Sequence, residues 1–289
     1  MSAIYKREVK AYFTSVLGYM MIGVFLFLIG LFFWGNNLKG QNASVGATLY
    51  SVSSLFIIIL PMLSMRLFAE EQRQKTDQLL FSAPVTIMEV ILGKFFAVVT
   101  VFSVPFLLVC TMPLVISTYA SGKYPFLTNY ASILIFWLMG CVMLSLGILI
   151  SSMTDSQVVA GLVSIAVNFL IWLMSSIASI IPATATASVI GISILLLLGC
   201  IFLFVFMKNI IVAGATFVVG EAILVALLQW KSTIFESLFG KILSSVSFYS
   251  RAADFVDGTF SVGTIIYFVS FIWLFLYLTM QMIQKRRYS

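Results

Sequence analysis

Long apolar stretches dominate this chain, and short polar segments separate them. Eight of the stretches come near the roughly 20 residues that a membrane-spanning helix needs. They cover residues 17–35, 48–65, 91–117, 130–152, 157–181, 188–207, 210–229 and 261–283. Pro61, Pro105 and Pro113 lie inside them, where neighbouring helices can satisfy the carbonyl groups that a proline leaves free. The pattern predicts an all-α, polytopic helical membrane protein with about eight transmembrane helices.

The first 16 residues show a different, amphipathic pattern. On a helix that turns about 100° per residue, the apolar side chains fall within one arc and the charged ones outside it. The apolar set is Tyr5, Val9, Tyr12, Phe13, Val16 and Met20, and the charged set is Lys6, Arg7, Glu8 and Lys10. We therefore predict an interfacial helix over residues 1–16, with its apolar side among the lipid headgroups. A frayed basic tail is the alternative.

The longest polar segment before residue 230 covers residues 65–94, between two apolar stretches. Strong helix formers predict a helix over residues 70–81, which Pro84 would end. Thr86, followed three residues later by Glu89, matches a capping box at the start of a second helix. A rigid elbow over residues 66–90 would suit force transfer from a soluble partner. The alternative is a solvated loop helix without a partner.

Three motifs in this segment resemble those of a known family. They are Glu70-Glu71-x-x-x-x-Thr76, Leu79-Leu80-x-x-Ala83-Pro84-Val85 and Leu92-Gly93-Lys94. Near the C-terminus, Phe255-x-x-Gly258, Tyr267, Thr279 and Lys285-Arg286-Arg287 add to the likeness. The chain resembles the ABC type-2 exporter permeases, and among them the gliding-motility-type branch. The family loop commonly has Gly where this chain has Lys75 and Glu where it has Gln78. Its members usually have six spans, so the pair at 188–229 is a departure whose role is open.

The resemblance implies a non-catalytic permease subunit of an ATP-driven exporter, without a cofactor. Separate cytoplasmic ATPase subunits would bind the elbow, and a second permease subunit would complete a homodimer or heterodimer. The residues expected to couple to the ATPase are Glu70, Glu71, Arg73, Lys75, Thr76, Asp77 and Pro84. Because folding and insertion depend on the apolar stretches, reversal of Glu71 to lysine should leave both intact and weaken ATPase binding or its coupling to transport.

The distribution of basic residues predicts the orientation in the membrane. Eleven Lys and Arg side chains fall on the side of the N-terminus and the elbow, and five fall on the other side. The positive-inside rule then places both termini and the elbow in the cytoplasm. Together with the resemblance, this predicts the plasma membrane of a bacterium. On the outer side, residues 231–259 repeat an apolar residue every four positions, which favours a second interfacial segment.

Composition excludes several other classes. The chain is 62% apolar and 9% charged, which leaves one membrane domain over residues 1–289 and no soluble domain. Its net charge of +6 is no nucleic-acid signal, because the basic residues cluster at the ends of spans. The absence of histidine excludes Ser-His triads and His-ligated zinc, and no phosphate-loop motif is present. The sequence therefore predicts no catalytic residue and no metal site.

Two features inside the apolar stretches are candidate functional sites. Small and polar residues share one face of the fifth stretch: Gln157, Gly161, Ser164, Asn168, Ser175 and Ser179. Such a face favours a dimer interface or a substrate path, with tight packing inside one subunit as the alternative. Glu221 is a possible intramembrane polar site, about 16 Å deep in the seventh stretch. The alternative is a protonated Glu221 that is hydrogen-bonded to a Ser or Thr of the neighbouring span.

These features leave two other functions open. An ion-coupled secondary transporter would use intramembrane carboxylates, of which Glu221 is the available one. A non-transporting membrane assembly subunit would need neither an ATPase nor a substrate path. The sequence itself does not name a substrate.

Overall fold

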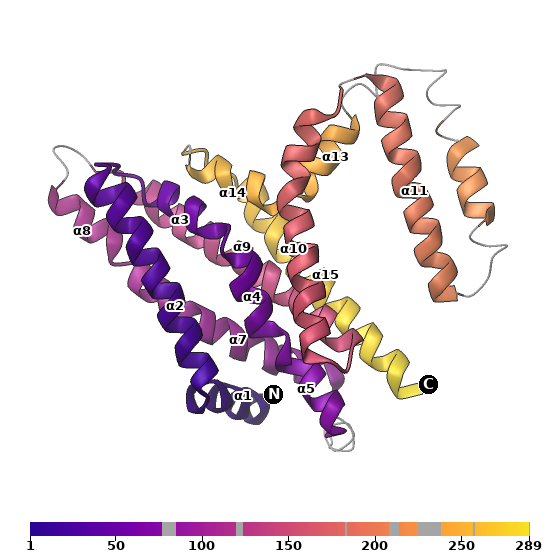
Figure 1. Cartoon of the computed structure of the whole chain (residues 1–289), viewed down its shortest axis with the longest axis horizontal. Helices are drawn as coiled ribbons and strands as arrows, with labels where there is room; N and C mark the ends of the chain where they lie inside the picture. The colour runs from indigo at the N-terminus through magenta and orange to yellow at the C-terminus, as the bar shows by residue number, and fades with distance from the viewer. Residues whose placement is uncertain are drawn as a thin grey trace. The chain divides into compact units, whose positions relative to one another are not determined.

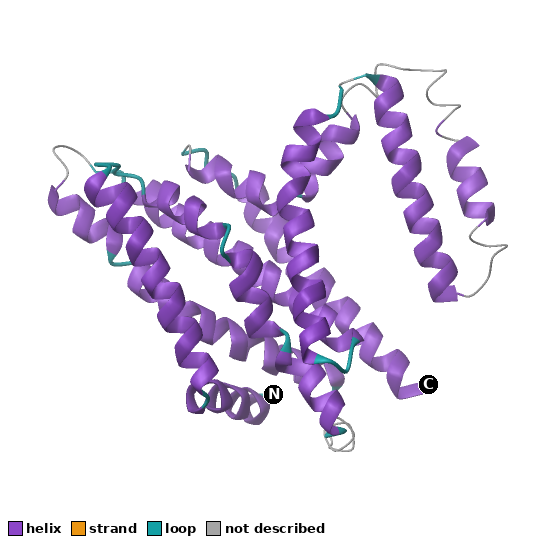
Figure 2. Cartoon of the chain, in the orientation of Figure 1, coloured by secondary structure: helices purple, strands orange, loops and turns teal. Residues whose placement is uncertain are grey.

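The computed structural model describes residues 1–76, 85–119, 124–182, 184–207, 214–222, 224, 238–256 and 258–288. Every regular element within these ranges is a helix, as Figure 1 and Figure 2 show. The predicted all-α, polytopic architecture is therefore confirmed. The chain divides into a first unit, residues 1–170 and 251–289, and a second unit, residues 171–250.

The helices follow one another closely along the chain. The N-terminal part contains α1 (Ser2–Thr14), α2 (Val16–Phe33), the π-helical turn η1 (Trp34–Lys39), α3 (Val45–Ser53), α4 (Phe56–Ser64) and α5 (Arg66–Gln74). The middle contains α7 (Ile87–Val109), α8 (Met112–Tyr119), α9 (Phe126–Met153) and α10 (Gln157–Ile180). The C-terminal part contains α11 (Ala185–Met207), helical residues 214–222, α13 (Leu238–Val246), α14 (Phe248–Val256) and α15 (Val262–Tyr288).

The described helices support fewer spans than the eight predicted. Five are long and apolar enough to cross a membrane: Gly18–Lys39, Ile87–Tyr119, Phe126–Met153, Gln157–Ile180 and Val262–Arg286. A sixth is added if Val45–Ser53 and Phe56–Gln74, which meet at 64°, form one broken span. The predicted span 188–207 coincides with α11, whereas most of 210–229 lies outside the described residues. The predicted outer segment 231–259 contains two helices, α13 and α14, and residues 231–237 lie outside the described part.

Helix α9 is the centre of the first unit. In its most apolar stretch 78% of the residues are buried, against 22% for the span of α2 and 22% for that of α15. Helices α3, α4, α5, α7 and α15 all pack against it. Helices α2 and α15 therefore keep broad apolar faces for lipid, while α9 holds the bundle together.

Two glycines allow this close packing on α9. A Cβ atom at Gly147 would lie 2.0 Å from Ser64 Oγ, so α4 approaches the α9 backbone at that point. A Cβ atom at Gly140 would lie 2.2 Å from the Phe102 ring of α7. Phe102 belongs to an aromatic cluster with Phe25, Phe56 and Phe106, whose ring centroids lie 4.9–6.4 Å apart.

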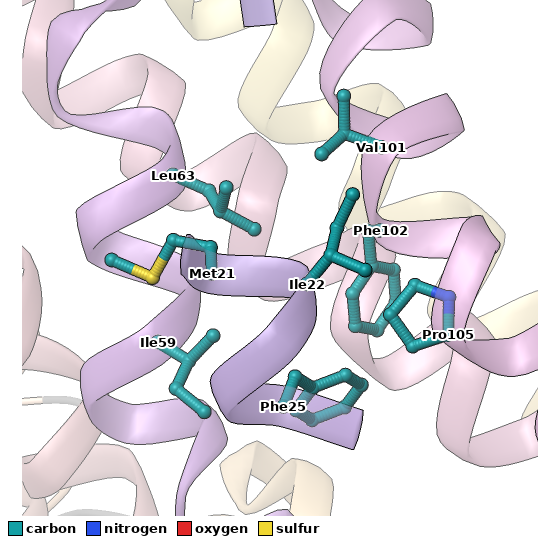
Figure 3. A pocket seen from close by; sticks show the side chains of 8 residues that line it. All are labelled: Met21, Ile22, Phe25, Ile59, Leu63, Val101, Phe102 and Pro105. Carbon is teal, nitrogen blue, oxygen red and sulfur yellow. The ribbon is translucent and has the colours of Figure 1, made fainter. Parts of the chain in front are cut away.

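An apolar pocket borders this cluster between α2, α4 and α7 (Figure 3). Its lining consists of Met21, Ile22, Phe25, Ile59, Leu63, Val101, Phe102 and Pro105. Since none of these side chains carries a charge or a hydrogen-bonding group, the pocket has no side chain that could recognise a polar substrate.

Helix α1 is a separate element, as predicted, but its environment differs from the prediction. Ser15 adopts an extended conformation (φ −93°, ψ 143°), which ends α1, and its Oγ accepts a hydrogen bond from Gly18 N (3.4 Å) at the start of α2. The predicted interfacial helix has Tyr12 on its apolar side, among the lipid headgroups, and Glu8 on its charged side, in water. Instead, Tyr12 is fully buried and the Glu8 carboxylate contacts Lys94 of α7. Helix α1 therefore packs on protein through these side chains.

We expect Gly147→Ala to destabilise the bundle by about 1–3 kcal/mol, because the new methyl group would push α4 away from α9. Gly23→Ala is the matched control, since Gly23 is an exposed helical glycine with no neighbouring atom within 4 Å of a Cβ. It should be neutral or slightly stabilising. The measurement is thermal unfolding of the purified protein in detergent, and equal unfolding temperatures for the two variants would contradict this packing.

Candidate functional site

The start of α5 is fixed to the end of α9 by one serine. Ser151 Oγ donates a hydrogen bond to Met65 O (2.8 Å) and accepts from Phe68 N (3.2 Å) and Ala69 N (3.1 Å). These bonds satisfy backbone groups where α4 gives way to α5. One turn later, Gln72 Nε2 donates to Ser152 O (3.1 Å). Helix α5 is thus held to the most buried helix of the first unit.

The end of α5 is a left-handed cap at Lys75. Lys75 has φ 55° and ψ 23°, and its N–H donates to Gln72 O (3.1 Å). Thr76 N donates to Glu71 O (3.0 Å), which completes a Schellman motif. The helix predicted over residues 70–81 is therefore wrong in its bounds: it starts at Arg66 and ends at Gln74. Residues 77–84, with Asp77 and Pro84, lie outside the described part of the chain.

A buried lysine joins three helices beside this cap. The Lys94 side chain of α7 is 1% exposed, and three oxygen atoms surround its ammonium group. It contacts Glu71 Oε1 at 2.9 Å, Glu8 Oε1 at 3.2 Å and Leu67 O at 2.7 Å. The Phe68 ring centroid lies 5.1 Å from the same nitrogen. The ammonium group therefore donates hydrogen bonds to α1 and α5, and the Glu71 carboxylate adds a second counter-charge.

Arg7 bridges the same two carboxylates from the solvent side. Its guanidinium lies 2.9 Å from Glu8 Oε1 and 2.7 Å from Glu71 Oε1. Burial alone would raise the pKa of Glu8, but the positive charges of Lys94 and Arg7 outweigh burial and hold this pKa below its usual value. Glu8 is therefore ionised at neutral pH, and the cluster contains two cations and two carboxylates.

The other end of α1 is held by Tyr12. Its hydroxyl donates to Leu63 O of α4 (2.6 Å), and the Arg66 guanidinium lies 3.9 Å from its ring centroid. Burial raises the pKa of Tyr12 to about 12, so the hydroxyl stays protonated as the hydrogen bond requires. Near the N-terminus, Ile4 lies against Gly93, where a Cβ atom would approach it to 3.2 Å. We call the assembly of α1, α5 and the start of α7 the three-helix junction (Figure 1).

The capping box predicted at the start of α7 is confirmed. Glu89 N donates to Thr86 Oγ1 (3.3 Å), and Thr86 N donates to Glu89 Oε2 (3.1 Å). The helix that carries Lys94 therefore starts at a fixed residue.

The small and polar face of α10 packs within the first unit over its N-terminal half. Gly161 lies against Met65, and Ser164 Oγ is 4.0 Å from the position of a Cβ at Gly147. Ser164 and Asn168 are fully buried, and neither Ser164 Oγ nor the Asn168 amide has a hydrogen-bond partner among the described residues. In the second unit, Ser175 Oγ bonds to its own helix at Trp172 O (3.5 Å). Gln157 is half-buried and Ser179 exposed.

Glu221 has a serine partner in the second unit. Ser193 Oγ of α11 donates to Glu221 Oε2 (3.1 Å), and Glu221 Oε1 is buried without a partner in the described part. Leu196 packs against Gly220 beside it. This arrangement matches the alternative in which Glu221 is hydrogen-bonded to a serine of the neighbouring helix.

The comparison with protein families decides what this chain is. The model of the ABC-2 family transporter proteins matches residues 3–229, which include the three-helix junction, α9 and α10. The chain belongs to this family. It is therefore a multi-pass membrane protein and a permease subunit of an ABC-type transporter. A comparison with curated proteins gave no match.

The structure separates the predicted coupling residues into exposed residues and one that belongs to the ion cluster. Glu70, Arg73, Lys75 and Thr76 are exposed at the free side and end of α5. Glu71 instead pairs with Lys94 and Arg7, so the expectation that its reversal leaves folding intact does not fit the structure. A lysine at position 71 would face the buried Lys94 ammonium group.

Sequence reasoning missed the residues that hold the junction together, namely Glu8, Tyr12, Arg66, Lys94 and Ser151. One signal was available, because Lys94 is a charged residue inside the apolar start of a span. Glu8, the single acidic residue of a basic helix, is the matching signal. Among the described residues, no group of His, Cys, Asp and Glu side chains could hold a metal ion.

We expect Lys94→Met to lower the stability of the protein by about 3–5 kcal/mol, because Glu8 and Glu71 would lose their buried counter-charge. Lys6→Met is the control, since Lys6 is exposed on α1, and it should change stability by less than about 0.5 kcal/mol. Both are measured by thermal unfolding in detergent. A Lys94 variant as stable as the Lys6 variant would show that the ion cluster does not hold the junction.

Proposed function

We propose that this permease moves a substrate out of the cytoplasm with energy from separate ATPase subunits that bind at the three-helix junction. The observation that carries the proposal is the construction of α5. Its end projects polar side chains, while its start is joined to α9 by Ser151 and to α1 and α7 through Lys94. A displacement applied at Lys75 and Thr76 would therefore reach three other helices at once.

The chain itself acts without catalysis and without a cofactor in this proposal. ATP hydrolysis belongs to the partner, and the permease supplies two conformations and a path. Two permease subunits, identical or different, form the complete transporter, as the resemblance to ABC type-2 exporters of the gliding-motility-type branch implies. The elbow residues Asp77 and Pro84 extend the same contact.

The proposed orientation places the junction and both termini in the cytoplasm of a bacterial cell. The bias of basic residues toward this side supports it. So does the position of the C-terminal helix, because Arg286 of α15 pairs with Asp155 (3.0 Å) in the turn after α9, at the same end as α5.

We place the substrate path along α10. Asn168 supports this, since its amide is buried in the span without a hydrogen-bond partner in the described part, and a polar group in that position is costly. Gly161 packs against Met65, between α4 and α5, and Ser164 lies near Gly147 of α9, whereas Ser175 remains a candidate for the dimer interface. An ion-coupled mechanism has less support, because Glu221 pairs with Ser193 and lies in a different unit from Asn168.

The test introduces one exposed cysteine at Gln74, on the last turn of α5, in a Cys110→Ser background in which the remaining cysteines, Cys141 and Cys200, are buried. We expect a bulky maleimide at Gln74→Cys to react only from the cytoplasmic side and to abolish ATPase binding and ATP-driven transport in nanodiscs and liposomes. Gln41→Cys, exposed at the other end of the first unit, is the control, which should react only from outside and leave ATPase binding unchanged. Undiminished ATPase binding by the labelled Gln74 variant would refute this site.

A further inference from the structure

Helices α1 and α5 together present a strongly cationic surface at the junction. The exposed cationic side chains are Lys6, Arg7, Lys10, Arg73 and Lys75, and we call this set the cationic surface. Glu70 is the one exposed carboxylate on the same two helices. Glu89, at the start of α7, is half-buried, and its carboxylate accepts from Thr86 N in the capping box.

The excess of positive charge arises from the ion cluster below the surface. Glu8 and Glu71 compensate the buried Lys94 and Arg7, so the other four cations of the surface face only one exposed carboxylate, Glu70. Their side chains are 14% and 17% exposed, and both turn toward the buried Lys94. The Arg7–Glu71 contact of 2.7 Å also brings α1 and α5 together, so the cations of the two helices share one face. Lys6, Lys10, Arg73 and Lys75 form no ion pair with a described residue.

With the membrane boundary at residue 65, where the second predicted apolar stretch ends, the α5 half of this surface extends past the lipid headgroups. Arg66 follows the apolar residues of α4, and Arg73 lies seven residues further along α5. The helical rise puts it about 10 Å beyond Arg66. A headgroup layer is only about 5–8 Å thick, and salt screens charges beyond about 8–10 Å. A soluble protein therefore suits Arg73 and Lys75 better than an anionic membrane.

We propose that the cationic surface binds an acidic surface of the ATPase. The inference rests on the proposed function and adds the chemistry of the contact: association is steered by net charge, and it weakens as salt rises. The permease selects an ATPase whose contacting face carries an excess of Asp and Glu, and it repels ATPases with a basic face.

The experiment uses the full chain in phosphatidylcholine nanodiscs and the ATPase subunit that copurifies with it. The double variant Arg73→Glu/Lys75→Glu should bind this ATPase at least about tenfold more weakly than the wild type. Raising salt from about 0.05 M to about 0.5 M should weaken wild-type binding strongly and the variant's binding much less. Unchanged thermal unfolding of the variant confirms that the fold is intact.

Glu70→Gln is a second test of net charge on the same helix, because it removes the exposed carboxylate. It should leave the affinity unchanged or increase it. A loss as large as that of the double variant would overturn the proposal, since individual groups rather than net charge would then decide binding. Salt-independent binding, or full affinity of the double variant, would overturn it too while leaving the proposed function in place.

A lipid contact is the remaining outcome, and vesicle binding distinguishes it from an ATPase contact. If the double variant keeps full ATPase affinity while Lys6→Gln/Lys10→Gln loses affinity for phosphatidylserine vesicles, the cationic surface contacts lipid and the proposal fails. If no ATPase binds the wild-type chain, the proposed function fails first and this inference with it.

Discussion

The three-helix junction depends on one buried cation. An ammonium group taken out of water costs several kcal/mol unless its charge and its N–H groups are all compensated. Lys94 takes its counter-charges from Glu8 of α1 and Glu71 of α5, and it donates hydrogen bonds to Glu8 and to the Leu67 carbonyl. The same carboxylates are thereby removed from the solvent-facing side, which leaves the outer surface of these two helices basic.

Helix α5 is rigid because its start is held by α9 and its end is capped. Its start is hydrogen-bonded to Ser151 of α9, the most buried helix of the first unit. Gly147 of α9 allows α4 to pack closely against the same helix. The end of α5 projects beyond those contacts as a capped helix. A force on the free end of α5 is therefore transmitted to the bundle through the start of the helix. This arrangement suits the proposed coupling of the permease to a separate ATPase.

Local chemistry in the sequence predicted local structure, and distant contacts escaped it. The Thr86 capping box and the amphipathic α1 depend on residues a few positions apart, so both were predictable. The partners of Glu71 lie far away along the chain, so its burial was not. The helix predicted to Phe81 ends at Gln74 because Lys75 adopts the left-handed conformation that suits the glycine common in related loops. Helix propensity gives no signal of that cap.

The central claim is that the ATPase binds α1 and α5 and that its effect passes into the bundle through them. Hydrogen–deuterium exchange of the chain in nanodiscs, with and without the ATPase, measures this directly. The account predicts slower amide exchange over residues 2–14 and 66–76 when the ATPase is bound, and no change over residues 36–48 at the opposite end of the first unit. Unchanged exchange over α1 and α5, with protection elsewhere in the chain, would contradict it.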